Sequence, residues 1–112
     1  MSLILQAWEE LVESLTDAGL EVVDDPRNLR PGTCMVDPPN IRGRSQSVVE
    51  LDFPVTIVAA PPANRDAYKY LVDMADLVIE AVPTSVGSPG TYQAGAQDLP
   101  SYQLTVTLTY RR

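Results

Sequence analysis

The residues of this chain that could do chemistry are mainly carboxylates, since it has 15 Asp and Glu, one cysteine and no histidine. Without histidine, we expect neither the usual Cys/His zinc sites nor histidine-based acid and base catalysis. Asp24, Asp25 and Asp37 lie in predicted turns but lack the spacing and the central glycine of a calcium loop. We therefore expect surface turn carboxylates and no metal site.

The remaining polar segments also lack a recognisable reaction centre. Carboxylates such as Asp73 and Asp76 would need a pocket to shift their pKa for acid and base work, and the sequence supplies none. The segment 84–98 holds three of the 6 glycines but has neither phosphate-loop pattern, GxxxxGK[ST] or GxGxxG. We expect no catalytic residue, no cofactor and no enzymatic activity. A small enzyme or ligand-binding domain is the least favoured alternative.

Size and charge narrow the class of protein further. A chain of 112 residues is predicted to form a single domain over residues 1–112. No apolar run approaches the roughly 20 residues that span a bilayer, and the first residues lack a basic export signal, so we expect a soluble chain without a membrane partner. The net charge of −7 argues against tight binding to a nucleic acid backbone.

Two amphipathic helices are predicted. Residues 2–18 place an apolar stripe at spacings of one, three and four, with Ser2 as a possible N-cap and Gly19 as the residue that ends the helix. Residues 65–82 form a second apolar stripe, which begins after Asn64 as N-cap and ends before Pro83.

The longest predicted strand is residues 47–60, around which the chain is organised. Period-two alternation puts one wholly apolar set on one face: Val49, Leu51, Phe53, Val55, Ile57 and Ala59. The opposite face is polar early and apolar late, which predicts cover on both sides only near the end of the strand. Pro54 cannot donate a ladder hydrogen bond, so we expect a bulge, a bend or an edge there, with two collinear pieces as one possibility.

Shorter strands complete the predicted sheet. Residues 20–23 and 33–37 are short strand candidates, and residues 102–111 alternate clearly, with a threonine ladder on the outer side. Residues 40–46 are predicted to form an exposed loop or a solvated hairpin between strands. Residues 84–98 are predicted to form a long loop or a mobile hairpin, with a strand piece at 91–94. The sequence therefore predicts an α+β fold: a mainly antiparallel sheet of four to five strands with two helices packed on it, in the order α-β-β-β-α-β(-β).

Polar residues on these loops and strands are the candidates for contact with a partner. Each also has a simpler interpretation as solvated surface. One possible contact joins the loop of Arg42 and Arg44 to an acidic helix of a second copy. The full candidate set is Arg42, Arg44, Glu50, Asp52, Tyr92, Gln93, Thr105, Thr107 and Thr109.

Several segments together resemble one family. They are the N-terminal helix running into Gly19–Val22, Asp25–Pro26 followed by Asn28–Pro31, Val36–Pro39, Phe53–Val55, Pro61–Pro62 and Leu99–Tyr102. In layout and length the chain is similar to the small tail terminator proteins of siphophages, particularly those of actinobacterial phages and, more distantly, the lambda-type terminators. The resemblance covers nearly the whole chain and includes no catalytic signature.

The resemblance implies a structural virion protein. Such proteins form a ring, usually a hexamer, that caps the tail tube, ends its polymerisation and offers a surface to the head connector. The expected partners are further copies of this chain, the tail tube protein and a head-tail connector or stopper protein. The expected location is the head-proximal end of the virion tail, after assembly in the host cytoplasm. An acidic lumen would let DNA pass without binding. The alternative is another head-tail connector, a head completion protein or a tail tube subunit.

Overall fold

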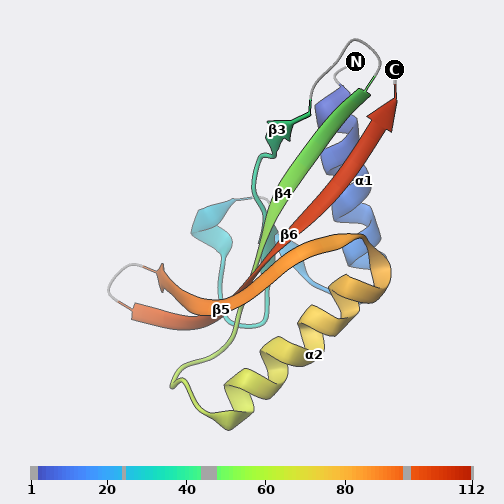
Figure 1. The fold of residues 1–112 in the computed structure, drawn as a ribbon. Coiled ribbons are helices and arrows are strands. Elements are labelled where there is room, and N and C mark those ends of the chain that lie inside the picture. The colour runs from blue at the N-terminus through green and yellow to red at the C-terminus, as the bar shows by residue number, and fades with distance from the viewer. Residues whose placement is uncertain (1–2, 24, 44–47, 95–96, 112) are drawn as a thin grey trace.

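The computed structural model describes residues 3–23, 25–43, 48–94 and 97–111, which form two α-helices and one six-stranded sheet (Figure 1). The elements are α1 (Leu3–Asp17), β1 (Val22–Val23), a 3-10 turn (Pro26–Asn28), β2 (Cys34–Val36), β3 (Asn40–Arg42), β4 (Val48–Val58), α2 (Arg65–Ala81), β5 (Thr84–Ala94) and β6 (Gln97–Arg111). The strand order is β1-β2-β4-β6-β5, and β3 pairs with β4. Only β1 and β2 pair in parallel among these strands, so the predicted α+β class with a mainly antiparallel sheet is confirmed.

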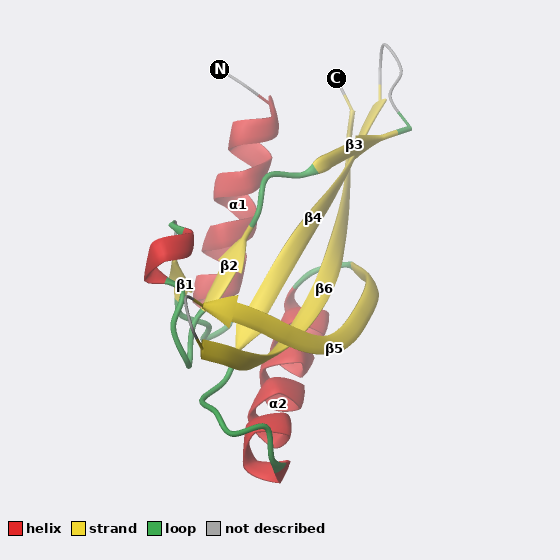
Figure 2. Ribbon diagram, turned by 90° about the vertical axis from the view of Figure 1, so that its left-hand side faces the viewer, coloured by secondary structure: helices red, strands yellow, loops and turns green. Residues whose placement is uncertain are grey.

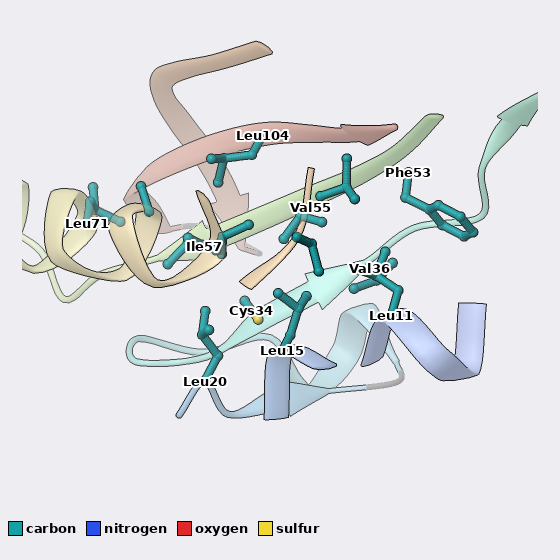
Figure 3. Close-up of a cluster of buried hydrophobic side chains, with 14 of the residues drawn as sticks. Leu11, Leu15, Leu20, Cys34, Val36, Phe53, Val55, Ile57, Leu71 and Leu104 are labelled. Carbon is teal, nitrogen blue, oxygen red and sulfur yellow. The ribbon is translucent and has the colours of Figure 1, made fainter. Parts of the chain in front are cut away.

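Both helices bury their apolar stripes against the same face of the sheet, as predicted (Figure 2). Leu11 and Leu15 of α1 and Leu71 of α2 share one core with the inward side chains of β4 (Figure 3). This core also takes Leu104 and Val106 from β6, which come from the inner side of the predicted alternation. The α-helices therefore cover one face of the sheet, and neither of them lies on the other face.

Strand β4 confirms the central prediction. Its six predicted inward residues, through Ala59, are each no more than 2% exposed. The strand is one continuous piece, and not two. Pro54 lies where the neighbour of β4 changes: Val55 pairs with β2, Asp52 pairs with β3, and the Pro54 carbonyl accepts a hydrogen bond from the Asp37 amide at 2.9 Å. The missing amide of proline thus falls at the junction between two partner strands, where the ladder is already interrupted.

The second face of β4 changes from polar to apolar along the strand, as the sequence predicts. Its end contributes Val58 to a small second core with Leu29, Met35 and Leu99. The chain after the 3-10 turn supplies Leu29, so this part of the sheet is covered on both faces. At the start of β4, near Glu50 and Asp52, the described residues form no such second core.

The structure has the predicted capping residues at the end of α1 and at the start of α2. Gly19 has a φ of 106°, which favours glycine, and the Leu20 amide donates to the Leu15 carbonyl at 3.1 Å. At the start of α2, Asn64 Oδ1 accepts a hydrogen bond from the Ala67 amide at 3.0 Å. The predicted N-cap Ser2 lies outside the described residues.

Parts of the two regions predicted as loops or hairpins form strands, which brings the sheet to six strands in the described part of the chain. Residues 84–94 form one long edge strand, β5, paired with β6 over its length, and β6 begins at Gln97. The glycines and the proline of β5 hid this strand from a periodicity argument, because no buried face imposes an alternation on it. Asn40–Arg42 pairs with Glu50–Asp52 as β3, a short exposed strand. Both corrections concern exposed strands, which form because they pair with a neighbouring strand and not because they bury an apolar face of their own.

Candidate interaction surfaces

A polar strip crosses the uncovered face of the sheet near the start of β4. Arg42 of β3 forms a two-pronged pair with Asp52: its Nε donates to Oδ2 at 2.8 Å and its Nη2 to Oδ1 at 3.2 Å. Its Nη1 also lies 3.5 Å from Glu50 Oε2. The register places Arg42 opposite Glu50 and diagonal to Asp52, within reach of a long side chain. One guanidinium thus neutralises charge on two carboxylates of its own chain.

The strip continues across β6 to β5. Thr107 Oγ1 donates to Asp52 Oδ1 at 2.9 Å and lies 3.1 Å from Ser85 Oγ. Ser85 Oγ in turn donates to the Thr105 carbonyl oxygen at 3.3 Å. These bonds link four adjacent strands through side chains. The strip is therefore a connected polar surface and not a set of independent solvated residues.

The charges in the strip shift the pKa values of its groups in the directions expected for an ion pair. The hydrogen bond from Arg42, helped by that from Thr107, lowers the pKa of Asp52, although desolvation opposes it. The hydrogen bond to Asp52 and the charges of Asp52 and Glu50 raise the pKa of Arg42. Both groups stay ionised at neutral pH, so neither is suited to accept or give up a proton there.

Most of the predicted partner residues come together in this strip. Arg42, Glu50, Asp52, Thr105 and Thr107 lie on β3, β4 and β6 at adjacent register positions, and Thr109 pairs with Glu50. The other predicted residues do not join them. Tyr92 and Gln93 lie at the far end of β5, where Tyr92 packs against the second core. Arg44 lies outside the described residues.

A groove that the sequence argument did not single out runs along α1 at the β1 edge of the sheet. It has a volume of about 440 Å³ and is lined by Leu5, Trp8, Glu9, Val12, Glu13, Val23 and Val36. We call it the α1 groove. Leu5 is 48% exposed. Trp8 and Val12 are half-buried and also pack against the core, whereas Leu5 is an apolar residue outside the predicted stripe and was the signal in the sequence.

A second partly apolar surface lies on α2. Arg65, Tyr68, Lys69 and Val72 surround a shallow hollow that we call the α2 patch. Tyr68 and Val72 are 52% and 50% exposed. Farther along the same helix face, Ile79 borders a groove of about 340 Å³ against β5 and β6. Tyr68, Val72 and Ile79 follow one another at spacings of four and seven, a helical repeat that was visible in the sequence but lay outside the buried stripe.

Outside the polar strip, the reactive groups that the structure describes are one cysteine and further carboxylates. Cys34 is buried, and desolvation raises the pKa of its thiol to about 12, so it is not a nucleophile at neutral pH. The described carboxylates and the cysteine include no group of three that could hold a metal ion. A cavity of about 460 Å³ near Tyr70 is lined mostly by Ala, Gly and Pro residues from the turns around Pro31 and Pro61. Within the described part of the chain, no helix is long and apolar enough to cross a membrane.

Comparison with protein-family models and with curated proteins found no match for this chain.

Proposed function

We propose that this chain is a structural virion protein that caps a phage tail tube as a homo-oligomeric ring. It would end tube polymerisation and offer the surface to which the head joins. The proposal combines the resemblance to siphophage tail terminators with the surfaces of the fold. A protein with this function needs no catalytic group.

The observation that carries the proposal is the pair of partly apolar surfaces at opposite edges of the sheet. The α1 groove lies at the edge formed by β1 and β2, and the α2 face with Ile79 lies beside the edge strand β5. A ring requires two different patches on each subunit, because each copy contacts one neighbour on either side through unlike surfaces. Surfaces at opposite edges of one sheet meet this requirement.

The charge and shape of the chain also support the proposal. A net charge of −7 on every subunit would give a ring a negative lumen, which repels the phosphates of passing DNA. The molecule measures 47 × 26 × 23 Å, and the long strands β4 and β6 run to the end where β3 lies (Figure 1). The polar strip lies on the face without helices, where it would be available to the tail tube or the head connector.

Deletion of the gene from its phage, with electron microscopy of the particles, tests this function. We expect tails of uncontrolled length, or tails that fail to join heads, and a plasmid copy of the gene should restore normal particles. Tails of normal length with unfilled heads would instead indicate a connector and contradict the terminator role. Light scattering at roughly 10–100 μM gives a second test, since oligomers depend on concentration. A chain that stays monomeric both alone and with tail tube protein would refute the ring.

A further inference from the structure

We infer that the α1 groove of one copy receives the α2 patch of the next, so that these two surfaces form the contact between neighbouring subunits. This inference rests on the proposed ring and names the surfaces that close it. The partner is thus a second copy of this chain. The contact is between unlike patches, which is the kind that a ring needs.

The first support is charge complementarity. Glu9 and Glu13 border the α1 groove, and Arg65 and Lys69 border the α2 patch. Each pair is separated by four residues on one helix, which places its two charges about 6 Å apart along the axis. Two carboxylates can therefore face two cations one to one. The pairing would also relieve the repulsion of like charges four residues apart on α1.

The second support is that, among the described residues, these four charged groups form no ion pair within their own subunit. Among the described residues, Arg27, Arg30 and Arg42 form ion pairs, whereas Arg65 and Lys69 form none. The neighbouring Glu10 bonds to Gln6 and Tyr110, but Glu9 and Glu13 have no such contacts in the described part of the chain. Arg42 is already held by Asp52, so Arg65 and Lys69 are better placed than the predicted Arg42 loop to meet the acidic helix.

The third support is the match of apolar residues. Leu5, Trp8 and Val12 lie in the α1 groove, and Tyr68 and Val72 stand out from α2. The groove residues from Leu5 to Glu13 span about 12 Å of helix, and Arg65 to Val72 span about 10 Å. Aromatic side chains such as Trp8 and Tyr68 are enriched at the centres of protein interfaces. A helix-in-groove contact with an apolar centre and a charged rim follows from these positions.

The fluorescence of Trp8 can report on this contact, because Trp8 is the only tryptophan of the chain and it lines the α1 groove. We would measure the emission maximum of Trp8 and the molar mass by sedimentation from about 1 to 200 μM, a range that covers micromolar dissociation constants. The expected result is a blue shift that rises together with the mass. A chain that stays monomeric over this range, with constant emission, overturns the inference.

Two charge reversals test the pairing itself. Glu9→Lys with Glu13→Lys changes the net charge from −7 to −3. The smaller net charge by itself reduces repulsion between subunits and favours association. We nevertheless expect binding to weaken about tenfold or more, because the two lysines would face Arg65 and Lys69. Arg65→Glu with Lys69→Glu should weaken it similarly. Arg27→Glu with Arg111→Glu is the matched control for this second variant, because both change the net charge from −7 to −11. Circular dichroism and the melting temperature verify that each variant folds.

Mixing the two reversed variants gives the decisive outcome. In the mixture, a basic α1 groove meets an acidic α2 patch at one contact, and the original pairing returns at the next, so association should recover. Recovery supports the inference. Failure to recover, or equal weakening by the control, overturns it. If these reversals leave association unchanged while gene deletion still abolishes length control, this contact is wrong and the proposed function stands. If the contact is verified but tails form normally without the gene, the proposed function fails.

Discussion

Ser101 and Thr33 are both deeply buried, but only the hydroxyl of Thr33 forms hydrogen bonds among the described residues. We predict that removing the two hydroxyl groups changes the stability of the fold in opposite directions. Ser101 is 1% exposed, and its Oγ has no hydrogen-bond partner among the described residues. Thr33 is 2% exposed; its Oγ1 donates to the Arg30 carbonyl oxygen at 2.7 Å and accepts from the Arg30 amide at 3.1 Å. Burial is the same in both cases, so the difference lies in the hydrogen bonds alone.

The expected magnitudes follow from these contacts. A buried polar group without a partner costs about 1–3 kcal/mol, so Ser101→Ala should stabilise the fold by about 1 kcal/mol after the loss of one packed atom. Thr33→Val keeps the shape of the side chain but leaves the Arg30 amide without its acceptor, and it should destabilise the fold by about 1 kcal/mol. For a chain of this size, each change corresponds to roughly 4 °C in melting temperature, in opposite directions.

Urea unfolding, followed by circular dichroism, measures both free energies of unfolding. The dependence of the free energy on urea should be the same for the two variants and the wild type, because neither changes the surface exposed on unfolding. Destabilisation by Ser101→Ala, together with no effect of Thr33→Val, would refute the hydrogen-bond reasoning. A stabilised Ser101→Ala with an equally stabilised Thr33→Val would show that apolar burial alone decides both sites.

Three further predictions concern the core and the polar strip. Phe53→Ala should lower the free energy of unfolding by about 3–5 kcal/mol, because Phe53 is 0% exposed and a cavity would remain; a loss below about 1 kcal/mol in urea unfolding would contradict its central place. The pKa of Asp52 is lowered in the folded state, so its ionised form contributes stability above its unfolded pKa of about 3.9, and this contribution is lost as pH falls through the folded pKa. The stability difference between wild type and Asp52→Asn should therefore be present at pH 7 and vanish in acid, and a difference that does not change with pH would contradict it. Cys34 should react with iodoacetamide at pH 8 only after unfolding, because burial raises its pKa to about 12, and rapid labelling of the folded chain would disprove this.

The polar strip shows where prediction from the sequence reached its limit. The residue types and the alternation of β4 and β6 placed Glu50, Asp52 and Thr107 on one face, and the register confirms that they are neighbours. A contact of Arg42 with another copy was one possibility raised by the sequence, and in the structure its guanidinium pairs with Asp52 of its own chain. The formation of β3 decides this, because the pairing of Asn40–Arg42 with β4 brings the arginine over Glu50 and Asp52, eight and ten residues away in the chain.

The full length of the edge strand and the walls of the grooves could not be predicted for a related reason. Strand β5 has glycines and a proline in place of an alternating pattern, and its conformation comes from its ladder with β6. The α1 groove needs Val23 and Val36 beside α1, and these residues come together only when β1 and β2 pair. Such surfaces depend on distances between elements, which no local pattern encodes.

The sequence by itself determined the elements whose own side chains are buried or capped: the alternating strand β4, the outer and inner sides of β6, and the helices that end at Gly19 and begin at Asn64. In these segments, the hydrophobic effect and backbone capping act within a few residues, so the pattern is local. Tertiary structure alone decided the pairing of β3 and β5, the internal ion pair of Arg42 and the grooves at the two sheet edges. These features arise from contacts between distant segments, whose partners are fixed only when the core has brought the elements together.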